Sequence, residues 1–561
     1  MQPKLAFITR ALFKPQTAPQ EKMGAVFTKP WIVNLILDLA GYKSDVDLVS
    51  SIAIEPSAGE GAFLVAMAVR LLESARLSGR SPLDCGNSLI AYELEESTAR
   101  TARDAVVQAL TLNGISIVQA EALAAKWIRI GDYLLEAASL PTAKFVIGNP
   151  PYIRLEDMLD ERADLYRSEY STMKGRADIY VAFFQAALSQ LAKDGVCAFI
   201  CADRWMLNQY GEELRRFITS GYAVENVIEM HNADAFLSDV SAYPAITVIR
   251  RTKQRSVVVA SVDREVEKDG SRLARTLCAV ASGVKTNSEK GVNAERVDAW
   301  FSGRQPWPCK SPKQLAVLKK LEASFPSLEN SATHTKVGIG VATGADEVFI
   351  TKDSTLVEPS RLLPLAMASD IGAGVLEWSG NYLINPWDND GLVDLREYVL
   401  LNAYLQTFSA ALKKRHVAKK NVNAWMRTID RVNMSLLPKP KLYIADIRER
   451  IDPALDHGRT YPHHNLYFVQ SERWDLEVLG ALLLSDFGQF FVESYGVRMR
   501  GGYLRFQAQY LRRIRVPDPN NISVAQTHAL RTAFRTRDIQ AATQIASDLY
   551  ETDAPEVMRG R

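Results

Sequence analysis

Residues 144–157 have the sequence KFVIGNPPYIRLED, in which a run of apolar residues ends directly in Asn149-Pro150-Pro151-Tyr152. Such a run is typical of a buried strand. Each proline fixes its backbone and removes an N–H donor, so the neighbouring carbonyl groups face outward, unpaired by the local strand ladder. The stretch therefore predicts a buried strand that ends by presenting hydrogen-bond acceptors.

These acceptors suit the methylation of an amine. The side-chain oxygen of Asn149 and the carbonyl of Pro150 can accept both hydrogens of one NH₂ group. An amine conjugated to a ring is a poor nucleophile because its lone pair is delocalised. Two acceptors draw it toward tetrahedral geometry and stabilise the charge that develops during transfer. Tyr152 can stack on the ring. We therefore predict Asn149, Pro150, Pro151 and Tyr152 as catalytic residues; the alternative is a structural Asn-Pro turn.

Around this motif, strand-like and helix-like segments alternate from about residue 24 to 251. The strand-like runs are SIAIEP, LIAYEL, FVIGNPP, VCAFICA, VENVIEM and AITVIRR. Two intervening segments have apolar residues at helical spacing, and we expect them to end at Gly79 and Gly195. Strands that alternate with helices predict an α/β fold with a mostly parallel sheet.

A glycine turn follows the first strand of this region. The strand ends in Glu55-Pro56, the chain passes through Gly59 and Gly61, and a helix begins near Phe63. Glycines let the backbone turn sharply and approach a ligand closely. The first βα turn of a doubly wound sheet is where nucleotide-like ligands bind, and Glu55 can meet a cofactor's positive amino group. An ordinary βα turn is the alternative.

Two more acidic residues are candidate cofactor contacts. Glu93 ends LIAYEL, one βα unit after the glycine turn, where a carboxylate can hold both hydroxyls of a ribose. Asp132 in IRIGDYLLE can accept an adenine amino group while Tyr133 packs on the adenine ring. A surface strand end for Glu93 and a simple turn for Asp132 are the alternatives.

Together these motifs resemble the amino-group (N6-adenine) DNA methyltransferases of restriction-modification systems. In that subclass the cofactor motifs come first, the Asn-Pro-Pro-Tyr motif follows, and a target-recognition domain comes last. The resemblance implies a Rossmann-like class I methyltransferase sheet followed by an α+β recognition domain. It also implies S-adenosylmethionine as cofactor, double-stranded DNA as partner, and methylation of N6 on an adenine flipped out of the duplex, without a metal.

The resemblance also implies roles for individual residues. Thr28, in the motif GAVFTKP, is expected to contact the methionine carboxylate of the cofactor. Phe236 is expected to stack on the target base opposite Tyr152, with Tyr243 as a substitute candidate. The predicted cofactor-binding residues are Thr28, Glu55, Pro56, Gly59, Gly61, Phe63, Glu93, Asp132, Tyr133 and Asn149.

The character of the chain changes at about residue 331, where short segments rich in Gly, Pro, Asn and aromatic residues begin. KVGIGVATGADEVFI and VRMRGGYLRFQAQYLRRIRVP resemble the opening and closing segments of the recognition domain. Basic residues interleaved with aromatic ones suit phosphate contacts, so we predict that Arg498, Arg500 and Arg505 bind DNA. A solvated, locally paired helix face is the alternative.

These boundaries predict five segments: an N-terminal arm (1–23), a catalytic domain (24–251), a connecting region (252–330), a target-recognition domain (331–520) and a helical tail (521–561). About 23 residues precede the first motif, too few for a nuclease domain. We therefore expect any restriction endonuclease partner to be a separate chain.

Bulk composition supports a globular protein and excludes a membrane span. The chain has 561 residues, of which 47% are hydrophobic and 24% charged, and the formal net charge of +2 does not by itself indicate a nucleic-acid binder. No uncharged apolar run reaches about 18 residues. Five scattered cysteines suggest neither a metal site nor disulfides, as expected in the cytoplasm.

Three other classes of protein deserve comparison. Protein-glutamine methyltransferases also carry Asn-Pro-Pro-Tyr, but they are much shorter. Ribosomal RNA methyltransferases acting on base amines are the closer alternative, and methyl incorporation into duplex DNA or ribosomal RNA separates the two. The intact cofactor motifs argue against a non-enzymatic DNA-binding module.

Overall fold

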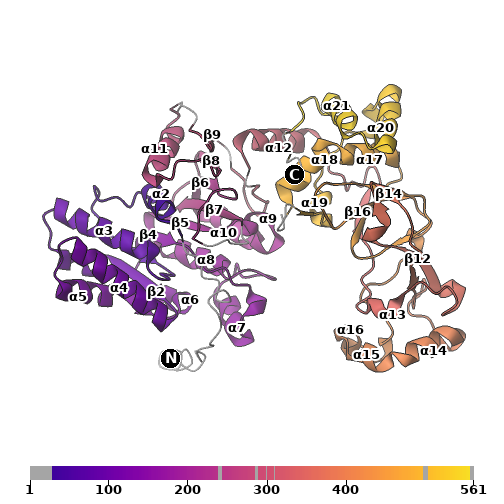
Figure 1. Cartoon of the computed structure of the whole chain (residues 1–561), viewed down its shortest axis with the longest axis horizontal. Helices are drawn as coiled ribbons and strands as arrows, with labels where there is room; N and C mark the ends of the chain where they lie inside the picture. Colours follow the sequence, from indigo (N-terminus) through magenta and orange to yellow (C-terminus); the bar gives the residue numbers. More distant parts are fainter. Residues whose placement is uncertain are drawn as a thin grey trace. The chain divides into compact units, whose positions relative to one another are not determined.

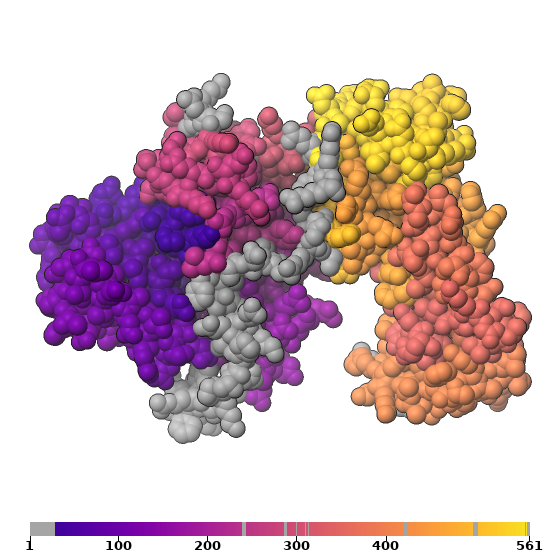
Figure 2. All heavy atoms as spheres, in the orientation of Figure 1, coloured from indigo at the N-terminus to yellow at the C-terminus, as the bar shows by residue number. Residues whose placement is uncertain are grey.

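The computed structural model describes residues 28–237, 243–284, 289–298, 300–308, 310–496, 503–555 and 557. The chain divides into two compact units, Met1–Leu315 and Ala316–Arg561. Figure 1 labels their helices and strands, and Figure 2 shows all heavy atoms in the same orientation.

Within the described residues, the first unit is built on a nine-stranded sheet of order β3-β2-β1-β4-β5-β7-β6-β8-β9. Its strands are β1 (Ala53–Glu55), β2 (Leu89–Glu93), β3 (Ile128–Ile130), β4 (Ala143–Gly148), β5 (Leu191–Ala202), β6 (Ala223–Glu229), β7 (Pro244–Arg250), β8 (Val257–Val262) and β9 (Val292–Val297). The five neighbouring strands β3, β2, β1, β4 and β5 are parallel. Strand β7 runs antiparallel to β5 and β6, and β9 runs antiparallel to β8. The predicted α/β fold is thus confirmed.

The strand order reverses between β1 and β4. From β1 the chain adds β2 and then β3 on one side, and it then crosses to the other side to form β4. In open α/β sheets, ligands bind outside the carboxyl ends of the strands at such a switch point. The topology therefore predicts a ligand-binding site at the residues that follow Glu55 and Gly148.

Helices cover both faces of this sheet. Alternate strand residues point to opposite faces, and Ala53 and Ile54 of β1 accordingly belong to two different apolar clusters. The first cluster includes residues of α2 (Pro30–Ala40), α3 (Ala62–Leu77), α4 (Glu96–Leu112), α5 (Ile117–Trp127) and α11 (Gly270–Ala281). The second includes residues of α6 (Tyr133–Glu136), α7 (Asp160–Glu169), α8 (Tyr180–Gln190), α9 (Arg204–Leu207) and α10 (Glu212–Gly221).

One of the two predicted helix ends is correct and the other is wrong. Helix α3 ends at Leu77, close to Gly79 as predicted. Helix α8 ends at Gln190, five residues before Gly195, because Leu191 already pairs with Ala143 of β4. Pairing with the neighbouring strand thus takes precedence over the local helical pattern.

The region predicted as a connection after residue 251 contributes to the sheet. Strand β8 pairs in parallel with β6, β9 pairs with β8, and α11 packs against α2. The compact unit therefore continues to Leu315. The apolar run of β8 extends the sheet because it can bury itself only against another strand and the covering helices.

The second unit is an α+β assembly, in agreement with the predicted fold class. Two four-stranded sheets have the orders β10-β20-β16-β18 and β11-β15-β12-β19, and the described residues add the pairs β13-β14 and β17-β21. The strands are β10 (Lys336–Ile339), β11 (Ile350–Thr351), β12 (Leu362–Ala366), β13 (Ile371–Gly372), β14 (Val375–Leu376), β15 (Tyr382–Ile384), β16 (Lys441–Ala445), β17 (Ile447–Arg448), β18 (Ala454–Asp456), β19 (Tyr461–Pro462), β20 (Leu466–Gln470) and β21 (Leu504–Arg505).

Helices complete the second unit. They are α13 (Asp346–Phe349), α14 (Val399–Thr407), α15 (Ser409–Lys414), α16 (His416–Lys420), α17 (Leu476–Leu484), α18 (Asp486–Tyr495), α19 (Ala508–Leu511), α20 (Val524–Thr536) and α21 (Ile539–Tyr550), and most of α12 (Pro312–Ser324). The expected tail helix is α20, which Ser523 caps and which packs against α17. No helix among the described residues combines the length and the apolarity needed to cross a bilayer.

Candidate active site

The carboxyl ends of β1 and β4 bring the glycine turn and the tetrapeptide that is predicted to be catalytic together. Ile54 pairs with Val146, so the two strands end side by side. The packing there is close, since a Cβ on Gly148 would lie 3.5 Å from Cδ of Pro56. The hydroxyl of Ser57 donates a hydrogen bond to the main-chain carbonyl of Asn149 at 2.9 Å. The two predicted motifs therefore form one site.

The backbone of the glycine turn adopts angles that favour glycine. Gly59 has φ 53° and Gly61 has φ 97°, and both values lie in the left-handed region that side chains rarely adopt. The N–H of Gly59 donates to Oε2 of Glu93 at 2.9 Å. The other carboxylate oxygen of Glu93 accepts hydrogen bonds from the N–H groups of Leu94 and Glu95, at 2.8 and 3.0 Å. Glu93 is thus held directly beside the turn, and its role toward a ribose stays a prediction.

Glu55 is a buried carboxyl group with an unused acceptor. Its exposed fraction is 1%, and among the described residues its Oε2 has no hydrogen-bond partner. Burial raises the pKa of Glu55 well above the ordinary value, and the nearby charge of Glu93 raises it further. An unsatisfied buried acceptor is costly. The position thus suits a ligand that brings a cationic amino group, and the residues present fit S-adenosylmethionine.

Thr28, Asn149 and Phe236 also meet, although they lie far apart in the sequence. The side-chain amide nitrogen of Asn149 donates to the hydroxyl of Thr28 at 3.2 Å. Thr28 in turn forms an isolated β-bridge with Phe236. In this arrangement the nitrogen of the Asn149 amide faces Thr28.

The two aromatic residues expected to stack on the target base have different surroundings. Tyr152 is half-buried, its hydroxyl donates to the carbonyl of Ile200 at 3.4 Å, and its ring packs edge-on against Tyr180. Phe236 has an exposed fraction of only 9% and belongs to the apolar cluster on the other face of the sheet. Stacking of a base between them stays a prediction.

Asp132 and Tyr133 are engaged by protein groups. Asp132 caps α6 through a 3.0 Å hydrogen bond from the N–H of Leu134, and its second oxygen accepts from the hydroxyl of Tyr166 at 2.5 Å. The ring of Tyr133 stacks on Phe183 at 5.6 Å, and its hydroxyl donates to Gln190. Their roles toward a cofactor stay predictions.

Sequence reasoning missed Tyr166 of α7. Helix α7 is mostly polar, but its residue Tyr166 and its C-cap residue Tyr170 lie four residues apart and are both buried. Residues at that spacing share one helix face. An aromatic pair on an otherwise polar helix was the available indication that this face packs onto the site.

Of the three predicted DNA-binding arginines, the structure describes one. Arg498 and Arg500 lie outside the described residues. Arg505, on β21, forms an ion pair with Asp446 at 2.8 Å, and its side chain is 42% exposed. The alternative of pairing with a local acid therefore applies to Arg505, although its exposure leaves room for a phosphate contact.

The described residues include one group that can hold a metal ion, formed by Asp346, His463 and His464, whose ligand atoms lie within 4.8 Å of one another. Nε2 of His463 and Oδ2 of Asp346 are 3.2 Å apart, which satisfies both without an ion. None of these residues belongs to the methyl-transfer site.

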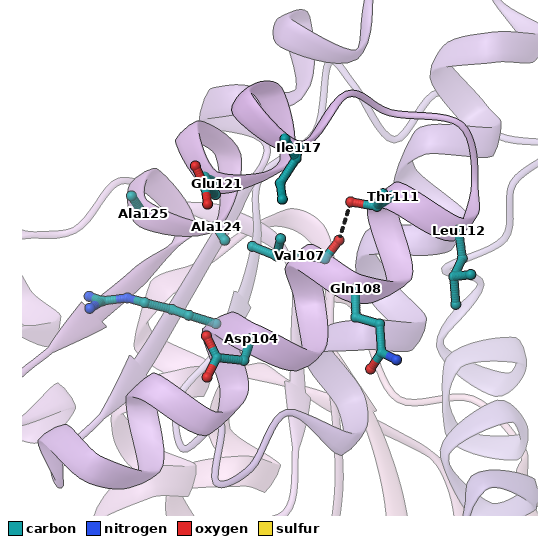
Figure 3. A pocket seen from close by; sticks show the side chains of 10 residues that line it. Asp104, Val107, Gln108, Thr111, Leu112, Ile117, Glu121, Ala124 and Ala125 are labelled. Atoms are coloured by element: carbon teal, nitrogen blue, oxygen red, sulfur yellow. Dashed lines mark hydrogen bonds between the residues drawn. The ribbon is translucent and has the colours of Figure 1, made fainter.

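A surface hollow of about 530 Å³ lies between α4 and α5 (Figure 3). Val107, Leu112 and Ile117 contribute much of its apolar lining, and Arg103, Asp104 and Glu121 its charged groups. None of the predicted site residues lines it. The candidate active site is therefore at the strand ends, and not in this hollow.

Several known proteins are similar to this chain in sequence or in fold. Residues 136–236 match the family model of the Eco57I restriction-modification methylase. The type II methyltransferase M.XhoI of Xanthomonas vasicola is 40% identical over 545 residues, which cover 96% of this chain and 98% of the relative. M.PaeR7I of Pseudomonas aeruginosa is 42% identical, with 94% of this chain and 92% of the relative covered. The solved structure of the type IIL restriction-modification enzyme MmeI in complex with DNA has a TM-score of 0.56 at 12% identity, covering 94% of this chain and 73% of that one.

The strand order, the glycine turn and the acceptor tetrapeptide define a class I methyltransferase, a class of enzymes that use S-adenosylmethionine. With relatives at 40% identity or more over nearly their full length, the family is also shown. The chain belongs to the type II DNA methyltransferases of restriction-modification systems.

Proposed function

We propose that this chain transfers a methyl group from S-adenosylmethionine to N6 of an adenine that is flipped out of duplex DNA at a specific sequence. The observation that carries the proposal is the hydrogen bond between Ser57 and Asn149, which joins the cofactor turn to the amine-binding tetrapeptide. A methyl donor and an acceptor amine can meet only where these two elements adjoin.

The cofactor lies along the carboxyl ends of β1 and β2 in this proposal. Glu55 binds the amino group of its methionine part, Thr28 binds the carboxylate, and Glu93 binds the ribose hydroxyls. The turn of Pro56, Gly59, Gly61 and Phe63 approaches its backbone closely. The bound cofactor supplies a methyl group made electrophilic by a sulfonium. The unused buried oxygen of Glu55 supports this placement, since a cationic partner removes its desolvation cost.

Asp132 and Tyr133 bind the adenine of the cofactor in this proposal. The hydroxyl of Tyr166 now gives Asp132 a hydrogen bond of the kind that an adenine amino group gives. The carboxylate oxygen has a second lone pair, so it can accept from the adenine beside Tyr166 or after Tyr166 moves. The edge of the buried Tyr133 ring contacts the adenine of the cofactor in this proposal.

The target amine binds at the tetrapeptide. The side-chain oxygen of Asn149 and the carbonyl of Pro150 accept the two N6 hydrogens, and Pro151 keeps the backbone rigid. These acceptors interact more strongly with the amine as its positive charge develops, so they lower the barrier and do not merely tighten binding. Tyr152 and Phe236 hold the flipped base by stacking. The hydrogen bond from the Asn149 amide nitrogen to Thr28 is compatible with this role.

Double-stranded DNA is the proposed partner, with Arg498, Arg500 and Arg505 contacting phosphates and other side chains of the second unit reading base edges. The nuclease-deletion mutant of LlaGI, solved with a DNA substrate mimic, shares the fold at a TM-score of 0.50 and 12% identity. A restriction endonuclease is the second proposed partner.

The product identifies the reaction. The chain should be expressed in a host without its own DNA methyltransferases, beside the Asn149→Ala variant. Nucleosides from genomic DNA and from ribosomal RNA are then analysed by mass spectrometry, and the DNA is sequenced directly for modified bases. N6-methyladenine at one DNA sequence, absent with the variant, supports the proposal. N4-methylcytosine, or methyl groups in ribosomal RNA alone, contradicts it.

A further inference from the structure

Two exposed arginines lie beside the catalytic tetrapeptide. Arg154 follows Tyr152 by two residues, and it forms an isolated β-bridge with Asp178. Hydrogen bonds from Ile179 N–H to the carbonyl of Ile153 and from Leu155 N–H to that of Ala177, at 2.9 and 3.4 Å, flank this bridge. The bridge therefore fixes the backbone of both segments next to the site.

The side chains of this ribbon divide between the core and solvent. Leu155 and Ala177 are buried in the apolar cluster beneath α7. Arg154 lies between half-buried Ile153 and buried Leu155, and its side chain is 61% exposed. Arg176, next to Ala177, is 89% exposed. A rigid backbone thus presents two cations to solvent at the mouth of the site.

Glu156 lies between the two arginines without binding either one tightly. It is 3.8 Å from Nη1 of Arg154 and 3.8 Å from Nε of Arg176, beyond hydrogen-bond distance, and is itself 49% exposed. In the part of the chain that the structure describes, neither guanidinium donates a hydrogen bond to another residue. Exposed ion pairs of this kind contribute about 0–1 kcal/mol to stability, so this cluster adds little to the fold.

We propose that Arg154 and Arg176 bind the phosphates that flank the flipped nucleotide, and that Glu156 keeps the two guanidinium groups near each other while DNA is absent. This inference rests on the proposed function. A guanidinium fork matches the oxygens of a phosphate. A flipped nucleotide rotates about its own backbone and loses its stacking. Two cations that hold the adjacent phosphates stabilise that state where the base enters the site.

The test uses the full chain and a duplex that carries the sequence found methylated by direct sequencing, with 2-aminopurine at the target adenine. The double variant Arg154→Gln/Arg176→Gln should bind this duplex more weakly, by about tenfold for each lost contact near 0.1 M salt. The slope of log affinity against log salt should become shallower by about 2. The 2-aminopurine fluorescence at saturating enzyme should also fall. Cofactor affinity should stay at the wild-type value, which shows that the variant is folded.

Two further variants separate a phosphate contact from a structural role. Arg76→Gln is the matched control, since Arg76 is 72% exposed and paired with Glu73 on α3; its DNA binding should match wild type. Glu156→Gln breaks the same ion pairs as the double variant but removes a negative charge, so it should tighten DNA binding. If the cluster were only structural, the double variant and Glu156→Gln would change binding in the same direction.

The inference is overturned if the double variant keeps the affinity, salt slope and fluorescence of Arg76→Gln, or if Glu156→Gln weakens binding as the double variant does. Failure of the proposed function has a different signature. In that case the wild-type enzyme itself gives no rise in 2-aminopurine fluorescence, or it methylates a different atom.

Discussion

The hydroxyl of Ser57 donates a hydrogen bond to the main-chain carbonyl of Asn149 across 2.9 Å, although 92 residues separate them in the sequence. This bond joins the glycine turn to the Asn-Pro-Pro-Tyr tetrapeptide, which face the methyl donor and the acceptor amine in the proposed function. Small displacements at such a junction have large effects on rate, because the reacting atoms must meet in a narrow range of geometries.

Ser57→Ala should therefore lower kcat by about tenfold, the effect expected from losing one hydrogen bond worth about 1.4 kcal/mol. The dissociation constant for S-adenosylmethionine should change by less than about threefold. Ser57→Thr keeps the hydroxyl group and should recover most of the activity. Steady-state kinetics on the methylated duplex, with cofactor titration by calorimetry, check both values. A wild-type kcat in Ser57→Ala would show that this bond does not position Asn149.

Asn149→Ala should abolish methyl transfer while cofactor binding persists. The substitution removes one of two acceptors whose interaction with the amine strengthens as the transition state forms. Single-turnover methylation assays and cofactor calorimetry on the same purified protein measure the two effects. Substantial residual transfer by a folded variant is incompatible with the role assigned to Asn149.

Glu55→Gln should stabilise the cofactor-free protein at alkaline pH. Burial and the charge of Glu93 raise the pKa of Glu55 above its ordinary value of 4.5. A group whose pKa is raised by folding favours the folded state fully below the unfolded pKa, and this contribution is lost as pH rises through the folded pKa. The variant does not ionise, so its advantage over wild type in Tm should grow between pH 5 and pH 8.

The same substitution should weaken cofactor binding by about 1–3 kcal/mol, because a neutral amide replaces a charged acceptor. In wild type, affinity for S-adenosylmethionine should increase with pH, since its cationic amino group binds the ionised form of Glu55. Thermal unfolding and calorimetry at both pH values provide the test. Equal Tm differences at both values, with unchanged affinity, would remove Glu55 from the proposed site.

Neutralising Arg498, Arg500 and Arg505 together should weaken DNA binding and reduce its salt slope by up to about 2.7, since each phosphate contact releases counterions. Cofactor affinity should hardly change. Arg535→Ala serves as the control, because Arg535 is also a partly exposed arginine paired with an acid, Glu477. DNA titrations at several salt concentrations measure the affinity and its salt slope. A wild-type slope in the triple variant would favour purely local pairing, as already seen between Arg505 and Asp446.

Lys441→Met should destabilise the second unit by about 3–5 kcal/mol, the usual cost of breaking a buried ion pair from one side. Lys441 and Asp456 are 2.8 Å apart with side-chain exposures of 0% and 1%. The exposed pair of Arg396 and Asp394 provides the comparison, and Arg396→Met should change stability by less than about 1 kcal/mol. Urea unfolding followed by tryptophan fluorescence measures both; similar midpoints for the two variants would contradict this expectation.

The parts of the fold that sequence predicted correctly are those with strong local causes. The buried strand β4 and its tetrapeptide follow from an apolar run closed by two prolines, and α3 follows from a glycine turn and helical spacing. The end of α8 was mispredicted because its cause is not local. The helix ends before Leu191 because Leu191 pairs with Ala143, which lies far away in the sequence.

The same distinction applies to the candidate site. Glu55, Gly59 and Glu93 follow strands in a regular βα pattern, so sequence alone could bring them together, although their chemical roles remain predictions. The hydrogen bond from the Tyr166 hydroxyl to Asp132 depends on how α7 packs. The hydrogen bond between Ser57 and Asn149 depends on the pairing of β1 with β4. Contacts of this kind come from tertiary structure and have no local sequence pattern.

The contact of Thr28 with Asn149 and Phe236 has a consequence for biosynthesis. Domains form as units while the chain leaves the ribosome from its N-terminus. Thr28 is synthesised early. Asn149 follows 121 residues later, and Phe236 follows later still. A nascent chain that has not reached Phe236 therefore lacks this contact, and under the proposed function a prematurely terminated product that ends before this point is expected to leave the host DNA unmodified.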